Sequence, residues 1–180
     1  AIHIALKALD LRPGKVVVPT VSCPSPASVP LYSGHQPIFC DVSLRDFNMC
    51  PDALQRVLSD HPDVSAIMPV HLYGQMADMT PIMQIAHRHG LRVIEDAAQA
   101  LGSSWNGSRI GAIGDLISFS FQANKNLTTI EGGCLVCNND DEARLAEKYR
   151  LQGVTRTGLD GMDVDVLGGK FNLTDVNAAV

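Results

Sequence analysis

The chain has 180 residues and a formal net charge of −5, with 46% apolar and 5% aromatic residues. This length suits one sizeable domain, and the interspersed acids and bases lack the basic runs of nucleic-acid-binding proteins. No apolar stretch reaches the roughly 18 to 20 residues of a membrane span, and the first residues lack the order of a secretory signal peptide. We therefore expect a globular, cytoplasmic protein that binds neither nucleic acid nor membrane.

Strand and helix patterns alternate along the chain. Apolar runs that indicate strands lie at residues 15–19, 36–42, 65–70, 91–96, 115–121 and 133–137. The spacing of apolar residues predicts helices at residues 1–9, 25–31, 51–58, 79–89 and 140–152. Strands that are nearly continuous apolar runs, with helices between several of them, predict an α/β fold of three layers. In it, helices cover both faces of a mostly parallel sheet.

The cysteines form an odd, scattered set, which suggests reduced thiols of the cytoplasm. They are Cys23, Cys40, Cys50, Cys134 and Cys137. The last two have the spacing of a CxxC motif, but they fall in a predicted strand, where residues three apart face opposite sides. We therefore interpret them as ordinary small core residues and predict no metal site.

The most informative feature of the sequence is a pair of charged residues near two strand ends. Asp96 ends one predicted strand, and Lys125 follows the next one. A pyridoxal phosphate (PLP) site requires such a pair, because the amine forms an imine with the cofactor aldehyde and the carboxylate pairs with the ring nitrogen. Asp96 could instead cap a following helix, and most lysines are solvated surface charges. The glycine pair at residues 132–133, which would let backbone approach a flat ring or phosphate, favours the cofactor interpretation.

Three further polar residues lie where they could line the same crevice, at the carboxyl ends of strands. Ser120 could hold a phosphate oxygen, or it could lie on the polar face of its strand. Gln99, one helical turn after Asp96, could donate to the cofactor's phenolic oxygen or cover its ring. His71 could belong to the site, or it could be a buried structural histidine.

Three ordered motifs resemble those of the DegT-type (DegT/DnrJ/StrS) sugar aminotransferases, a family of fold-type I PLP-dependent enzymes. They are PVHLYGQ at residues 69–75, VIEDAAQA at 93–100 and SFSFxxxKNLxxxEGG at 118–133. The similarity runs over the whole chain. It implies an aminotransferase that moves an amino group from an amino acid, glutamate, to a nucleotide-linked keto-sugar in amino-sugar or polysaccharide biosynthesis. Another keto substrate, such as a cyclitol, and a non-catalytic α/β binding module are the alternatives.

The resemblance also implies roles for individual residues. Lys125 would be the Schiff-base lysine, Asp96 the partner of the ring nitrogen, and Gln99 a contact of the ring. Ser120 would bind the cofactor phosphate. Asn172 would reach the phosphate of the neighbouring subunit's cofactor, which implies a homodimer with shared active sites.

Two departures from the family pattern affect the expected site. The family often has an aromatic residue at the position of Cys23, which stacks on the cofactor ring, so Cys23 would contact the ring less strongly. The family's phosphate-binding turn would precede Ala1, and its small domain would follow Val180. Residues 1–180 would then be the central part of the large cofactor-binding domain. Members of the family that dehydrate sugars carry histidine in place of the lysine, so the retained Lys125 favours transamination. We expect residues 155–170 to contribute to substrate specificity.

Overall fold

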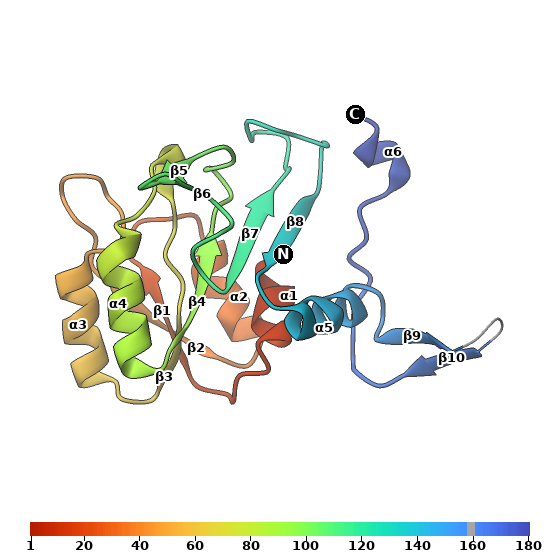
Figure 1. Ribbon diagram of the computed structural model, residues 1–180, viewed down its shortest axis with the longest axis horizontal. Coiled ribbons are helices and arrows are strands. Elements are labelled where there is room, and N and C mark those ends of the chain that lie inside the picture. The colour runs from red at the N-terminus through yellow and green to blue at the C-terminus, as the bar shows by residue number, and fades with distance from the viewer. Residues whose placement is uncertain (158–160) are drawn as a thin grey trace.

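The computed structural model describes residues 1–157 and 161–180. Within these residues lies a six-stranded sheet with the strand order β2-β1-β3-β4-β7-β8 (Figure 1). Its strands are β1 (Lys15–Pro19), β2 (Gln36–Cys40), β3 (Val64–Ile67), β4 (Arg92–Asp96), β7 (Leu116–Ser120) and β8 (Gly133–Cys137). Neighbouring strands are parallel except for the antiparallel pair β7 and β8. The predicted mostly parallel sheet is therefore confirmed.

Helices cover both faces of this sheet and make the three predicted layers. One face carries α1 (Ile2–Ala8), α2 (Ser25–Tyr32) and α5 (Asp140–Arg150). The other carries α3 (Pro51–Asp60) and α4 (Met79–His89). A short helix, α6 (Asp175–Ala178), lies near the end of the chain. None of the helices in the described ranges is long and apolar enough to cross a membrane.

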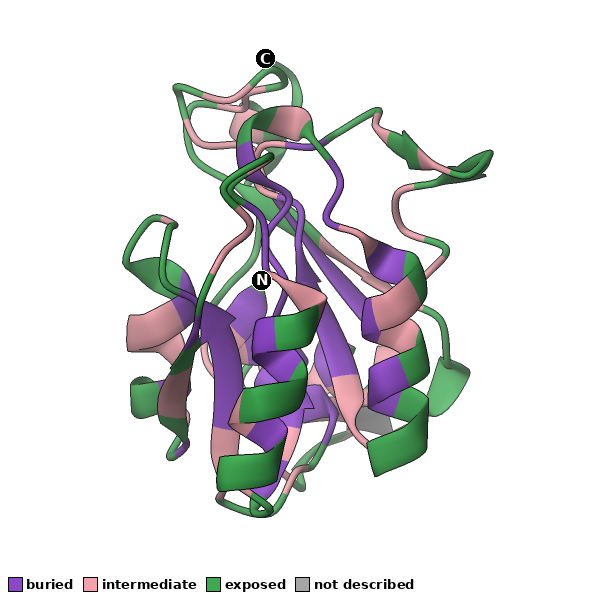
Figure 2. Ribbon diagram, turned by 90° about the vertical axis from the view of Figure 1, so that its left-hand side faces the viewer, coloured by how far each residue is buried: buried purple, intermediate pink, exposed green. Residues whose placement is uncertain are grey.

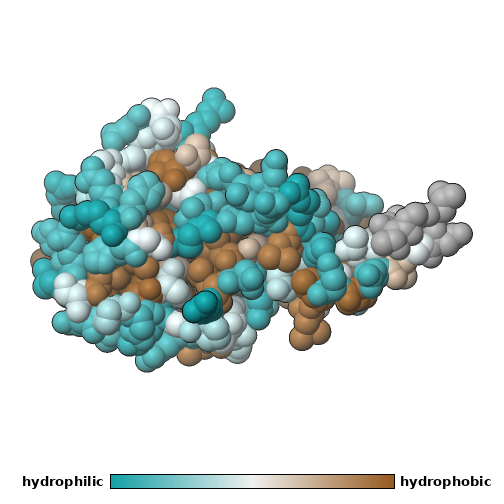
Figure 3. All heavy atoms as spheres, turned by 60° about the horizontal axis from the view of Figure 1, so that its bottom comes forward, coloured by the Kyte–Doolittle hydropathy of each residue, from teal (hydrophilic) through white to brown (hydrophobic). Residues whose placement is uncertain are grey.

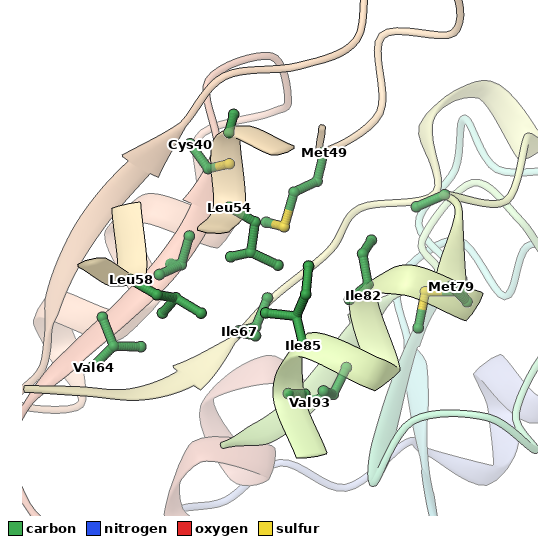
Figure 4. Close-up of a cluster of buried hydrophobic side chains, with 14 of the residues drawn as sticks. Cys40, Met49, Leu54, Leu58, Val64, Ile67, Met79, Ile82, Ile85 and Val93 are labelled. Carbon is green, nitrogen blue, oxygen red and sulfur yellow. The ribbon is translucent and has the colours of Figure 1, made fainter. Parts of the chain in front are cut away.

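The layer formed by α3 and α4 packs through apolar side chains that repeat with the helical period. Leu54 of α3 and both Ile82 and Ile85 of α4 are almost completely buried. Figure 4 shows them around Ile67 of β3, with Val93 of β4 close by. Gly90 ends α4 in the left-handed conformation, with φ of 64°, which a glycine adopts without steric cost.

The strands supply side chains to both layers because successive residues of a strand face opposite sides. Val17 belongs to the cluster under α3 and α4, whereas Val16 and Val18 belong to the cluster under α1. Figure 2 shows the sheet as a buried central layer with half-exposed helices in front of it. A strand buried on both faces needs a continuous apolar run, which is why the sequence pattern located these strands.

Two hairpins were not predicted. In the first, β5 (Ser104–Trp105) and β6 (Ser108–Arg109) flank Asn106 and Gly107, whose φ values of 47° and 81° suit a two-residue hairpin turn. Strands of two residues are too short to show a period. The second hairpin, β9 (Val154–Thr157) with β10 (Gly161–Val164), occupies part of the expected specificity segment. Residues 158–160 of that segment lie outside the described residues.

Candidate active site

Five of the residues predicted for the site gather around one hollow of about 1060 Å³ at the carboxyl ends of β4 and β7. Its lining includes Cys23, Asp96, Ser120, Lys125 and Asn172. Figure 1 shows how they converge: the loop between β7 and β8, which carries Lys125, extends beyond the strand ends, and the C-terminal segment runs beside it. Residues that are far apart in the sequence therefore share one space.

Asp96, the last residue of β4, has a side chain that faces the hollow and a backbone that is locked in place. Its N–H donates to the Pro69 carbonyl at 2.9 Å and its carbonyl accepts from the His71 N–H at 3.0 Å. The side chain is only 2% exposed, and one carboxylate oxygen accepts from the Ala98 N–H at 3.0 Å. The next residues form turns instead of an α-helix, so this bond closes a local turn and caps no helix.

Burial dominates the electrostatics of Asp96. Desolvation raises the pKa of its carboxyl, while the Ala98 hydrogen bond and the positive charge of Lys125 act in the opposite direction. A carboxylate in this position is costly unless a cation approaches it closely. The site is therefore suited to a positively charged partner.

Glu95, the neighbour of Asp96, points to the opposite side of the strand and forms a buried pair with His71. The two side chains are fully buried, and Nε2 of His71 lies 2.6 Å from Oε2 of Glu95. Nδ1 of His71 accepts from the Ala77 N–H at 3.1 Å, so the ring proton must lie on Nε2 and point to Glu95. Oε1 of Glu95 accepts from the Gly114 N–H at 2.5 Å. Each ring nitrogen of His71 therefore has a hydrogen-bond partner in the protein interior. This arrangement agrees with the interpretation of His71 as a buried structural histidine.

The loop that carries Lys125 is held by its own backbone and by threonines. The Lys125 N–H donates to the Gln122 carbonyl at 2.9 Å. The Phe121 carbonyl accepts from the Thr129 N–H at 3.0 Å and from the Thr128 hydroxyl at 3.1 Å. These bonds return the chain to β8 and leave the half-buried Lys125 at the wall of the hollow.

Close packing explains why glycines occupy the two positions after this loop, in addition to the predicted approach of a ligand. A Cβ on Gly132 would lie 2.5 Å from Oγ1 of Thr129 and 2.8 Å from Cδ1 of Leu173. A Cβ on Gly133 would lie 2.6 Å from the Phe119 carbonyl oxygen. Both glycines also line the hollow. The glycines therefore let the loop, the sheet and the C-terminal segment pack closely.

Ser120 and Asn172 bring polar groups to the same hollow. The Ser120 hydroxyl oxygen accepts from the Gln122 N–H at 3.3 Å, which leaves its proton available to an acceptor in the hollow. Oδ1 of Asn172 accepts from a guanidinium nitrogen of Arg150 at 3.2 Å. Within this single chain Asn172 thus lines the chain's own hollow. Its predicted reach to a neighbouring subunit stays a prediction.

Gln99 does not line the larger hollow but lies in a smaller recess of about 350 Å³ beside Lys125, and its predicted contact with the cofactor ring stays a prediction. Tyr73, Asn124, Lys125 and Asn126 line this recess too. Oε1 of Gln99 accepts from the Tyr73 N–H at 2.8 Å, so its NH₂ group points away from that backbone. Lys125 lines both spaces and connects them.

Sequence reasoning missed Glu95, Tyr73 and Arg150. An acid inside a predicted apolar strand was the signal for Glu95, because a buried charge needs a partner. Tyr73 and Arg150 gave no signal, since an exposed tyrosine or arginine is ordinary on a surface.

The family model described as "DegT/DnrJ/EryC1/StrS aminotransferase family" matches residues 1–180. The chain is 40% identical over 188 residues to the GDP-perosamine synthase of Caulobacter vibrioides, with 100% of this chain and 48% of the relative covered. It is also 40% identical over 182 residues to a UDP-N-acetyl-3-dehydro-alpha-D-glucosamine 3-aminotransferase of Acidithiobacillus ferrooxidans, with the same coverage. The chain thus spans about half the length of the curated relatives it matches.

Among solved structures, NtdA from Bacillus subtilis with bound cofactor PMP has 32% sequence identity and a TM-score of 0.89. The match covers 99% of this chain and 40% of that one. The fold, the ordered motifs and the family match over the full length agree. The chain belongs to the DegT/DnrJ/EryC1/StrS aminotransferase family.

Proposed function

We propose that the full-length protein is a PLP-dependent aminotransferase that moves an amino group from an amino acid, glutamate, to a nucleotide-linked keto-sugar in amino-sugar or polysaccharide biosynthesis. The observation that carries the proposal is that Lys125 and the buried Asp96 line one hollow. The names of the two relatives, a GDP-perosamine synthase and an aminotransferase for a UDP-linked sugar, support the substrate class.

The side chains around the hollow fit PLP by their chemistry. Asp96 would hold the protonated ring nitrogen, because a cation in direct contact offsets the cost of burying its carboxylate. Ser120 would donate its hydroxyl proton to a phosphate oxygen. Cys23 would contact the ring through its small, polarizable side chain. When bound, PLP supplies an electron-withdrawing ring that stabilises negative charge on the substrate carbon.

Lys125 would have two roles, which its place between the two spaces supports. Its ε-amine would attach the cofactor covalently through the aldehyde carbon. After an amino donor has displaced it, the free amine would carry a proton between the substrate carbon and the cofactor carbon. Because the lysine lies on a loop held by backbone hydrogen bonds, its amine would return to the same place in each half of the reaction.

We also propose a homodimer with shared active sites, in which Asn172 reaches the phosphate bound to the neighbouring subunit. Exposed apolar side chains near Asn172 support this proposal: Phe171 is 50% exposed, Leu173 37% and Val176 78%. Figure 3 shows that hydrophobic residues reach the surface in several places, between hydrophilic ones. Apolar exposure next to a site residue is therefore a more specific indication of a subunit interface than apolar exposure alone.

Residues 1–180 would form the central part of the large cofactor-binding domain of this enzyme. Coverage of about half of the relatives' length supports that assignment. The five cysteines are free thiols in the structure, which fits a reducing compartment such as the cytoplasm.

Borohydride reduction of the full-length protein tests the central claim. After reduction, mass spectrometry of tryptic peptides should find the cofactor on Lys125, and Lys125→Ala should bind cofactor without forming that adduct. Lys148→Ala is the matched control, because Lys148 is a surface lysine that pairs with Asp165. If Lys125→Ala still yields the same reduced adduct, the assignment of Lys125 is wrong.

A further inference from the structure

The recess beside Lys125 has a lining that suits a different ligand from the larger hollow. Gln99, Asn124 and Asn126 supply amides, and Tyr73 supplies an aromatic ring. We propose that this recess holds the hexose ring of the acceptor substrate and that Tyr73 is a specificity-determining residue. The inference rests on the proposed function and names the part of the site that selects the sugar.

Connectivity supports a substrate in this recess. Lys125 and Asn124 line both spaces, whereas Asp96 and Ser120 line the larger one. An amine that binds the cofactor and then moves a proton at the substrate carbon must be reachable from both. The volume of about 350 Å³ lies at the small end of ligand pockets and suits one ring, not a whole nucleotide-linked sugar.

The chemistry of the lining favours a neutral polyol over a carboxylate. Each hydroxyl of a sugar both donates and accepts, and an amide group offers both functions. Because Oε1 of Gln99 is bonded to the Tyr73 N–H, its NH₂ group is left as a donor. A carboxylate ligand would need fixed cations, and Lys125 is the one charged side chain that lines the recess in the described part of the chain.

Tyr73 lies in a short 3-10 helix, η1 (Leu72–Gly74), whose backbone is anchored on both sides of it. Its side chain is 84% exposed, yet its backbone has φ of 55°, which is uncommon for a non-glycine residue. On one side of Tyr73, the Leu72 N–H donates to the buried Asn48 side chain at 3.0 Å. On the other side, the Gly74 carbonyl accepts from the Ser103 hydroxyl at 2.7 Å. A strained backbone that holds an exposed aromatic ring beside a polar recess indicates a contact surface for a ligand.

Binding of unreactive sugar nucleotides to the full-length holoprotein tests this inference. Calorimetry would compare GDP-mannose with GDP, and UDP-N-acetylglucosamine with UDP, because these sugars carry no keto group. At least one sugar nucleotide should bind wild type more tightly than its own nucleoside diphosphate. We call the ratio of these two affinities the gain from the sugar. Tyr73→Ala should reduce this gain by about tenfold, as truncation of an aromatic anchor does, and leave the affinity for the diphosphate unchanged. Asn126→Ala should reduce the gain in the same way.

Two variants serve as controls. Tyr73→Phe keeps the ring and should keep most of the gain. Tyr32→Ala removes a tyrosine that is 80% exposed on α2 and lines neither space, so it should bind as wild type does. The backbone N–H that Gln99 accepts from is present in every Tyr73 variant, so loss of that bond would not explain an effect.

The inference is overturned if Tyr73→Ala keeps the full gain from the sugar, if it weakens the diphosphate equally, or if wild type shows no gain with either sugar. Each of these results leaves the covalent adduct at Lys125 as a separate measurement. Failure of the sugar recess can therefore be distinguished from failure of the proposed function.

Discussion

Glu95→Gln tests the buried pair beneath the site with almost no change of shape. Both oxygens of the Glu95 carboxylate accept hydrogen bonds, one from the Gly114 N–H and one from Nε2 of His71. A glutamine has one oxygen, so its NH₂ group must face one of these donors. His71 cannot relieve the conflict by moving its proton, because its Nδ1 accepts from the Ala77 N–H.

The cost of Glu95→Gln follows from the burial of both partners. Their side chains are 0% exposed, so no water can satisfy the donor that is left over. An unsatisfied buried donor costs about 1 to 3 kcal/mol of unfolding free energy. With a urea m-value of about 3 kcal/mol/M, the unfolding midpoint should fall by roughly 0.3 to 1 M.

Urea unfolding of the full-length, cofactor-free protein, followed by circular dichroism, measures this midpoint. Asp141→Asn is the control, since Asp141 pairs with Arg144 on the surface and its side chain is 85% exposed. That change should leave the midpoint near the wild-type value, because exposed ion pairs contribute little. A Glu95→Gln midpoint equal to that of wild type would refute the assigned hydrogen-bond pattern and proton position.

Two further predictions concern Asp96 and Cys40. Burial raises the pKa of Asp96 above its ordinary 3.8, so the unfolded chain loses this proton at lower pH than the folded protein does. The resulting loss of unfolding free energy is absent below pH 3.8 and complete above the pKa that Asp96 has in the folded protein. Cofactor-free Asp96→Asn should therefore exceed wild type in urea midpoint at pH 7, with a gap that closes as the pH falls toward 3.8; equal midpoints throughout would contradict this. Burial also raises the pKa of the Cys40 thiol to about 12, so roughly one thiol in ten thousand is ionised at pH 8. Iodoacetamide should label the exposed Cys23 long before Cys40, as peptide mass spectrometry would show, and equal rates would contradict that burial.

The central strands of the sheet were predictable because they are buried on both faces. A strand such as Lys15–Pro19 lies between two helical layers, so its core residues must all be apolar, and this leaves a continuous run in the sequence. The hairpin around Asn106 and Gly107 leaves no such run, because its strands have two residues each and lie on the surface.

The sequence by itself determined the layered fold, its main helices and strands, and the two residues on which the proposed chemistry depends. Asp96 and Lys125 were found because parallel strands end at one edge of a sheet, so order along the chain translates into proximity there. Tertiary structure alone decided which way each neighbouring side chain points. Consecutive residues of β4 face opposite sides, so Asp96 meets the hollow while Glu95 binds His71 in the interior. It also brought Gln99 and Tyr73 together in the recess beside Lys125. There the backbone N–H of Tyr73 fixes the amide of Gln99, and no pattern in the sequence records such a contact.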